Sequence, residues 1–302
     1  MKKKLIIVLG PTGVGKTELS LSLAEHLGCD IISCDSRQFY RELRIGTAAP
    51  DEDQLKRVRH HFVGMLELED YYSCGRFETE MLKKAEELYN EKDTLIMVGG
   101  SMLYIDAITK GIDDRPEVDE ELRNSLWERY EKEGIEKMRD ELKMLDPKYY
   151  EQMDQKNYKR IIHALEICIA TGKPYSDLRS QSSKKRDFDI IKIGLSLPRE
   201  ELYERINKRV DKMVEKGLIE EAKALYNKKD LNSLNTVGYK EIYKWMDGEW
   251  DKDHAIEMIK QDSRRYAKKQ MTWFKRDEEI TWFDPTEIEE VTKFIDEKLA
   301  EK

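Results

Sequence analysis

The sequence has few cysteines, and none of them stands in a metal-binding pattern. Its 302 residues include four cysteines, at positions 29, 34, 74 and 168. No two of them form C-x-x-C, and no histidine lies at metal-ligand spacing from them. This pattern predicts reduced, partly buried thiols and a cytoplasmic protein.

Long apolar runs are also absent. No stretch approaches the ~18 consecutive apolar residues of a membrane-spanning helix, so we expect no membrane partner. The start of the chain, three lysines followed by an apolar run to Leu9, imitates a signal peptide. That run is too short and ends at Gly10-Pro11, so it fits a buried parallel strand better.

Positive charge is in the minority. Charged residues make up 38% of the chain and the net charge is −8, which predicts a well-hydrated surface and argues against a nucleic-acid partner. The segment 258–276 is different, because it holds seven basic residues and one acid. Together with Tyr266 and Trp273, these residues form either a phosphate-tracking surface or the solvated face of a helix.

A phosphate-binding loop follows the first strand. Residues 10–17 match G-x-x-x-x-G-K-[ST], after a strand-like run at 4–9 and before a helical pattern at about 16–27. In such a loop the backbone N–H groups, the lysine and the hydroxyl converge on a diphosphate or triphosphate and its Mg²⁺. The loop comprises Gly10, Pro11, Thr12, Gly13, Val14, Gly15, Lys16 and Thr17.

The first hundred residues alternate strand and helix signals. Further strands are expected at 31–34 and 94–98, with a helix at about 76–90 between them. This rhythm predicts an α/β fold, a P-loop-containing parallel sheet flanked by helices. Ligands of such sheets bind beyond the carboxyl ends of the strands, so the P-loop, Asp35 and Gly99–Ser101 should meet at one crevice.

The segment from 113 to 186 is charged, helical and almost free of glycine. Ile161, Ile162, Leu165 and Ile169 form one apolar helix face, which a stop at 171–174 follows. Residues 181–186 are expected to form a loop before a strand at 190–195. We therefore predict a discontinuous catalytic core, 1–112 and 187–302, with an all-helical insertion at 113–186. After the strand at 190–195, the second part of the core should be helical apart from a short strand at 280–283.

Asp35 follows a strand, so it is either a turn or helix-capping residue or a carboxylate facing the phosphate site. In the second case it could accept a proton from a nucleophile or hold Mg²⁺ through water. The strand at 94–98 ends in Gly99-Gly100-Ser101, without the acid that usually holds the metal of a nucleoside triphosphatase. This argues against ATP hydrolysis.

Other candidate residues have two interpretations each. Arg205 and Arg209 lie four residues apart on a predicted helix, where they are surface charges or neutralise a leaving diphosphate. His60 and His61 have no further ligand in sight, so a structural role is expected for them.

Eight segments in the same order resemble the tRNA dimethylallyltransferase (tRNA isopentenylpyrophosphate transferase) family over nearly the whole chain. They are Gly10–Thr17, Asp35-Ser-Arg-Gln-Phe-Tyr40, Ile45–Ala48, Val98-Gly-Gly-Ser-Met-Leu-Tyr104, Arg160–Lys173, Leu202–Met213, Val237-Gly-Tyr-Lys-Glu241 and Arg265–Phe274. The resemblance implies transfer of a dimethylallyl group from dimethylallyl diphosphate to N6 of adenine 37 in the anticodon loop of tRNAs.

The resemblance also implies roles for residues. Asp35 would be the base near N6, Lys16 and Thr17 would contact the donor diphosphate, with Thr17 at Mg²⁺, and Arg205 would lie beside the leaving group. The tRNA contacts would be Asp35, Ser36, Arg37, Gln38, Ser101, Arg123, Lys159, Arg160 and His163. A base stacked in the anticodon loop must be extruded to reach a buried donor, which favours a channel entered from both ends. We expect a monomer.

Three positions depart from the family pattern. Ala49 stands where lysine is frequent, which removes one tRNA phosphate contact. Ser101 replaces threonine and keeps the hydroxyl. His163 stands where arginine is frequent, so that contact should be weaker or pH-dependent.

Two other functions remain open from the residues. A small-molecule or nucleotide kinase uses the same loop for ATP, and the helical insertion could then be its lid. A non-catalytic nucleotide switch or RNA-binding module would bind tRNA without forming a covalent product.

Overall fold

The computed structural model describes residues 3–112, 119–178 and 184–301. The predicted boundary at 113 and the first half of the predicted loop at 181–186 lie outside the described residues. The chain divides into two compact units, one formed by Met1–Thr109 and Arg186–Lys302 and the other by Lys110–Lys185.

The first unit contains a six-stranded sheet in which every described pairing is parallel, so the predicted fold class is confirmed. The strand order is β3-β2-β4-β1-β5-β6, with β4 and β1 at the centre. The strands are β1 (Lys4–Leu9), β2 (Ile31–Ser33), β3 (His60–His61), β4 (Thr94–Gly99), β5 (Asp189–Leu195) and β6 (Ile280–Phe283).

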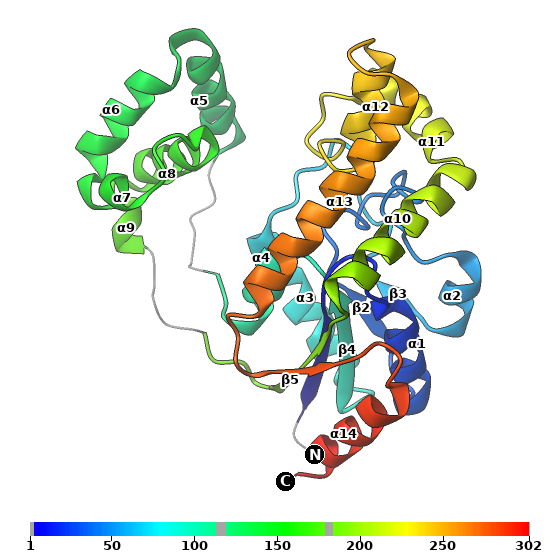
Figure 1. The fold of residues 1–302 in the computed structure, drawn as a ribbon. Coiled ribbons are helices and arrows are strands. Elements are labelled where there is room, and N and C mark those ends of the chain that lie inside the picture. Colours follow the sequence, from blue (N-terminus) through cyan, green and yellow to red (C-terminus); the bar gives the residue numbers. More distant parts are fainter. Residues whose placement is uncertain (1–2, 113–118, 179–183, 302) are drawn as a thin grey trace. The chain divides into compact units, whose positions relative to one another are not determined.

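Helices cover both faces of this sheet (Figure 1). The helices described in this unit are α1 (Lys16–Leu27), α2 (Glu52–Arg57), α3 (Cys74–Leu88), α4 (Met102–Thr109), α10 (Arg199–Glu215), α11 (Leu218–Ala224), α12 (Tyr239–Met246), α13 (Lys252–Phe274) and α14 (Ile288–Ala300), with a 3₁₀ turn at Tyr226–Lys228. The predicted strands at 4–9, 190–195 and 280–283 and the helix at 16–27 are confirmed.

The side chains of β1 alternate between two apolar clusters, as a strand buried on both faces requires. Ile6 and Val8 pack with α1 and α14, whereas Leu5, Ile7 and Leu9 pack with α3 and α4. The sheet is therefore the middle layer of the unit, and the carboxyl ends of its strands carry the loops of the candidate site.

The second unit is a helical bundle with its own apolar cluster. It consists of α5 (Glu120–Glu133), α6 (Ile135–Leu145), α7 (Pro147–Gln152), α8 (Tyr158–Thr171) and α9 (Tyr175–Leu178). Ile161, Ile162 and Leu165 of α8 are buried, as predicted, but Ile169 is 40% exposed. Ile169 lies in the last turn of α8. Helical periodicity predicts which face of a helix is apolar, but not how much of the helix length is covered by neighbouring helices.

The cysteines and the histidine pair have structural surroundings. The four cysteines, all of them described, form no disulfide bond, and Cys29, Cys34 and Cys168 are buried. The Nε2 atom of His61 lies 2.8 Å from the Asp30 carboxylate, and the Nδ1 atom of His60 lies 2.8 Å from the Val58 carbonyl oxygen. These contacts fit the structural role predicted for both histidines. In the described residues, no helix is long and apolar enough to cross a membrane.

Candidate active site

The P-loop joins the end of β1 to the start of α1 in a conformation that requires glycine. Gly13 and Gly15 have φ angles of 80° and 113°, which side chains with a Cβ rarely adopt. A Cβ on Gly10 would lie 2.7 Å from the carbonyl oxygen of Leu195, in the neighbouring strand. The Lys16 ammonium donates to the carbonyl oxygens of Gly10 (2.9 Å) and Pro11 (2.8 Å), so it lies over the loop.

The ends of β2 and β4 meet beside this loop, as the parallel sheet predicted. The backbone N–H of Ser36 donates to the Ser101 hydroxyl at 3.0 Å, and that hydroxyl donates to the Ser36 hydroxyl at 3.2 Å. A Cβ on Gly99 would lie 2.1 Å from the Cys34 carbonyl oxygen, so only glycine allows the two strand ends to approach this closely. Asp35 is held at this junction, where its carboxylate accepts the Arg37 N–H at 3.0 Å.

Helix α10 directs two arginines toward the P-loop. Arg209 donates to the Thr12 hydroxyl at 2.7 Å and to the Thr47 carbonyl oxygen at 3.5 Å. The Arg205 guanidinium lies 3.2 Å from the place that a Cβ on Gly15 would occupy. Four residues separate the two arginines, so one helix face presents both to the loop.

Helix α13 connects the P-loop with the end of β4. The Gln270 side-chain amide is 2% exposed; its oxygen accepts the Thr12 N–H and its nitrogen donates to the Gly100 carbonyl oxygen, each at 2.8 Å. One turn earlier, Tyr266 lines the cavities beside Asp35. A single buried amide therefore joins the loop, β4 and the helix that carries Tyr266.

Two cavities open from this constellation. One, of about 680 Å³, lies over the P-loop residues Gly13, Lys16 and Thr17 and against Arg205. The other, of about 340 Å³, lies between α10, α13 and the segment 235–240. Both are lined by Thr12, Asp35, Arg209, Met213 and Tyr266.

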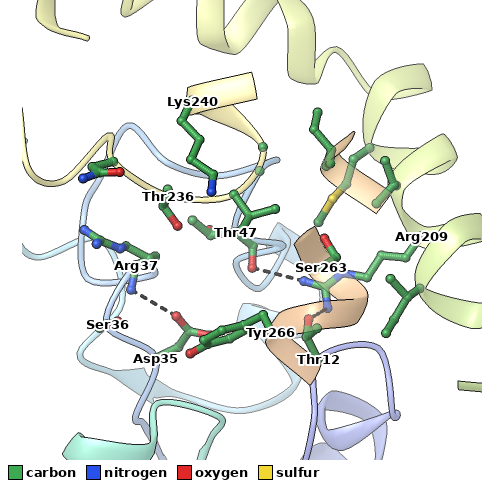
Figure 2. A pocket seen from close by; sticks show the side chains of 18 residues that line it. Thr12, Asp35, Ser36, Arg37, Thr47, Arg209, Thr236, Lys240, Ser263 and Tyr266 are labelled. Atoms are coloured by element: carbon green, nitrogen blue, oxygen red, sulfur yellow. Dashed lines mark hydrogen bonds between the residues drawn. The ribbon is translucent and has the colours of Figure 1, made fainter. Parts of the chain in front are cut away.

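Figure 2 shows the smaller cavity, with Arg209 reaching in from α10 and Tyr266 from α13. The apolar side chains Ile206, Val210 and Ile259 form part of its wall, and Lys240, Thr236 and Ser263 add polar groups. Because Asp35 and Arg209 line both spaces, a ligand over the P-loop and a ligand in the smaller cavity would meet at these two side chains.

Three basic side chains, Lys16, Arg205 and Arg209, lie next to the loop. Burial and, to a smaller extent, the nearby positive charge of Arg209 lower the pKa of Lys16 to about 7, against the opposing effect of the Asp35 carboxylate. Burial also lowers the pKa of Arg209, again against the effect of Asp35. Burial and the charge of Asp35 raise the pKa of Tyr266 to about 12, so its phenol is neutral at physiological pH.

Arg37 and Gln38 extend this site along the segment after Asp35. The Arg37 guanidinium donates to the carbonyl oxygens of Asn232 (3.0 Å) and Ser233 (3.1 Å). The Gln38 amide donates to the carbonyl oxygens of Thr47 (3.3 Å) and Ala48 (3.1 Å). Both side chains therefore fix the backbone around the cavities.

The remaining predicted tRNA contacts belong to the helical unit. Lys159 and Arg160 are exposed in the first turn of α8. Arg123 and His163 both approach the buried carboxylate of Glu166, at 3.3 and 3.4 Å. Each of the two units thus holds its own set of the predicted residues.

Sequence reasoning missed several residues of this site. Gln270, Tyr266 and Lys240 were noticed only as members of matching segments or of a basic helix. The partners of Gln270 lie far away in the chain, Thr12 at 258 positions and Gly100 at 170, so local patterns carry no signal for these contacts. Of the described residues, no three or more His, Cys, Asp or Glu side chains gather as a metal site.

The chain matches the family model described as IPP transferase over residues 38–277. The P-loop and Asp35 precede this range, but relatives extend the similarity to nearly the whole chain. The protein is 58% identical to tRNA dimethylallyltransferase 1 of Bacteroides fragilis, over 97% of each chain. It is 57% identical to tRNA dimethylallyltransferase 1 of Phocaeicola vulgatus, over 98% of each chain.

Solved structures show the same relationship. The tRNA isopentenylpyrophosphate transferase of Bacillus halodurans is 36% identical, with a TM-score of 0.72 over 99% of this chain and 98% of that one. A eukaryotic dimethylallyltransferase, solved as snapshots of the enzyme acting on tRNA, is 26% identical with a TM-score of 0.82, over 98% of this chain and 77% of that one. The chain therefore belongs to the IPP transferase family, together with the tRNA dimethylallyltransferases.

Proposed function

We propose that the protein transfers the dimethylallyl group of dimethylallyl diphosphate to N6 of adenine 37 in the anticodon loop of tRNAs, with release of diphosphate. One observation carries this proposal: Asp35 and Arg209 line both the cavity over the P-loop and the cavity beside it. A diphosphate in the first space and an adenine in the second would meet where a carboxylate is available. The names of the relatives support the same reaction.

The diphosphate end of the donor fits the P-loop side. The loop N–H groups, Lys16, Arg205 and Arg209 would stabilise the negative charge that develops on the diphosphate as the allylic C–O bond breaks. Arg209 is already oriented by Thr12 and Thr47, so little reorganisation is needed during the reaction. The reaction therefore depends mainly on neutralising the leaving group.

Mg²⁺ fits this end of the site. The Thr17 hydroxyl is exposed beside Lys16 in the larger cavity, and Mg²⁺ commonly combines one or two protein oxygens with phosphate oxygens and water. When bound to the diphosphate, the ion would supply further positive charge against the leaving group. Thr17 is the protein ligand that we assign to it.

Asp35 is the base in this proposal. As the C–O bond of the donor breaks, the N6 lone pair forms the new C–N bond, and the N6 proton passes to the Asp35 carboxylate. A hydrogen bond of 3.0 Å from the Arg37 backbone N–H fixes that carboxylate at the boundary of the two cavities. Tyr266 and the apolar wall beside it would exclude water from the cation-like transition state.

The tRNA would contact both units. Ser36, Arg37 and Gln38 line the two cavities and Ser101 bonds to Ser36. On the helical unit, Arg123, Lys159, Arg160 and His163 supply guanidinium, ammonium and imidazole groups. We place the enzyme in the cytoplasm, where its tRNA and donor are found, and expect it to act as a monomer. The kinase alternative gains no support from the relatives, which are named as tRNA-modifying transferases.

The direct test is mass analysis of nucleosides from tRNA incubated with the protein, Mg²⁺ and dimethylallyl diphosphate. We expect adenosine carrying one added isoprene unit, with a stoichiometric amount of released diphosphate. If ATP replaces the donor and the products are ADP and a phosphorylated acceptor, the protein is instead a kinase. Binding of tRNA without any covalent product would identify an RNA-binding module.

A further inference from the structure

The carboxylate of Glu221, on α11, is the centre of a dense group of hydrogen bonds. It accepts three successive backbone N–H groups: those of Arg44 (3.1 Å), Ile45 (2.8 Å) and Gly46 (3.0 Å). The Tyr239 hydroxyl donates to the same carboxylate at 2.6 Å. Hydrogen bonds to an ionised group are among the stronger ones in proteins, so this carboxylate holds the segment tightly.

The surroundings of the carboxylate leave little freedom. The Tyr239 ring is fully buried, and a Cβ on Gly46 would lie 2.6 Å from two of its carbon atoms. Burial and the charge of Glu221 raise the pKa of Tyr239, so the phenol remains a hydrogen-bond donor. The contact therefore needs glycine at 46, a phenol at 239 and an acid at 221.

The segment 44–48 that Glu221 holds is a wall of the active site. Gly46 and Thr47 line the smaller cavity, and Arg44, Ile45 and Ala48 line the larger one. Ala48 has a φ angle of 47°, which costs free energy for a residue with a Cβ and persists only when the surroundings impose it. The carbonyl oxygen of Thr47 accepts the Arg209 and Gln38 hydrogen bonds.

We infer that Glu221 is a positioning residue for the transfer reaction. Its carboxylate fixes the backbone of residues 44–46, which places the Thr47 carbonyl oxygen, and that oxygen orients Arg209 toward the leaving diphosphate. This inference rests on the proposed function and gives a role in it to Glu221, which lines neither cavity. If the inference is right, loss of the Glu221 carboxylate weakens diphosphate binding, and it does so through Arg209.

The test compares Glu221→Gln with the matched control Glu220→Gln, its exposed neighbour on α11. An amide at 221 offers one acceptor oxygen and turns an NH₂ group toward N–H donors. We expect Glu221→Gln to weaken inorganic pyrophosphate binding in Mg²⁺, measured by calorimetry, about tenfold, and to lower the single-turnover transfer rate by a similar factor. Glu220→Gln should change neither.

A double-mutant cycle separates positioning from a general structural role. In an Arg209→Lys background, Glu221→Gln should weaken pyrophosphate binding less than twofold, because the side chain through which it acts is already altered. Tyr239→Phe removes one of the four donor groups and should fold even if Glu221→Gln does not. We expect it to weaken pyrophosphate binding two- to fivefold, again only when Arg209 is present.

Equal effects of Glu221→Gln with and without Arg209 would overturn the inference. So would a less stable Glu221→Gln protein that binds pyrophosphate and transfers the prenyl group at the wild-type rate. Pyrophosphate binding does not depend on the prenyl acceptor, so failure of wild-type protein to modify tRNA would reject the proposed function and leave the binding cycle as a separate result.

Discussion

The two units of the chain hold their candidate residues in contrasting ways. In the P-loop unit, several polar groups of the site have a defined partner: Gln270 joins Thr12 to Gly100, Arg209 bonds to Thr12, and Ser101 bonds to Ser36. In the helical unit, Lys159 and Arg160 are exposed on the first turn of α8. Chemistry on a small ligand needs fixed geometry, whereas attraction of a polyanion needs only charge on a surface.

This contrast predicts that substitutions in the P-loop unit change rates and donor affinity, and that substitutions in the helical unit change tRNA affinity and its salt dependence. Four changes test it.

The largest effect is expected for Asp35→Ala. Loss of a general base lowers the rate of a chemical step by a factor of about 10²–10⁴, so the single-turnover transfer rate should fall by this factor. Donor and tRNA affinities should change little, because the diphosphate contacts lie elsewhere. Rapid-quench kinetics and filter binding measure the two quantities, and an unchanged rate would remove Asp35 from the mechanism.

The next effect concerns pH and Lys16. Its pKa of about 7 means that the ammonium of the free protein is charged below this pH and neutral above it. A bound diphosphate favours the charged form, so donor affinity should fall as pH rises above 7, by up to about tenfold per pH unit. Calorimetry with dimethylallyl diphosphate between pH 7 and 9 measures this. Lys16→Ala should bind weakly and without that slope; an equal slope in both proteins would exclude Lys16 as its source.

In the helical unit, Arg160→Glu should weaken tRNA binding about tenfold and lower the salt slope by about 1 to 2, as expected for lost phosphate contacts. Donor affinity should be unchanged. Lys132→Glu, on α5, replaces an exposed lysine that pairs with Glu128 and serves as the control. If Lys132→Glu and Arg160→Glu weaken tRNA binding equally, the loss of affinity results from the changed net charge of the protein and not from a defined tRNA-binding surface.

The smallest effect is expected for His163→Arg. A permanent guanidinium in place of the imidazole should tighten tRNA binding about two- to fivefold. Competition binding against the wild-type protein measures this. No gain in affinity would show that charge at this position does not limit binding.

The sequence predicted those features that have a local cause. The P-loop, the strand that precedes it and Asp35 after the second strand follow from glycine spacing and apolar runs, and the sheet then brings them together. The two-residue strand β3 and the six-residue helix α2 were missed, because so few residues give no periodicity. Gln270 and Glu221 were missed for a different reason, since the backbone groups that they bond are separated from them by 170 residues or more.

We propose that one connected site holds the diphosphate at the P-loop and the adenine at Asp35. A crystal structure of the protein with a tRNA anticodon stem-loop and an unreactive thiodiphosphate analogue of the donor tests this most directly. We expect the extruded adenine 37 with N6 at hydrogen-bonding distance from the Asp35 carboxylate and the analogue's diphosphate on Lys16 and Arg209. An adenine bound away from Asp35, or an analogue bound outside the P-loop, would contradict it.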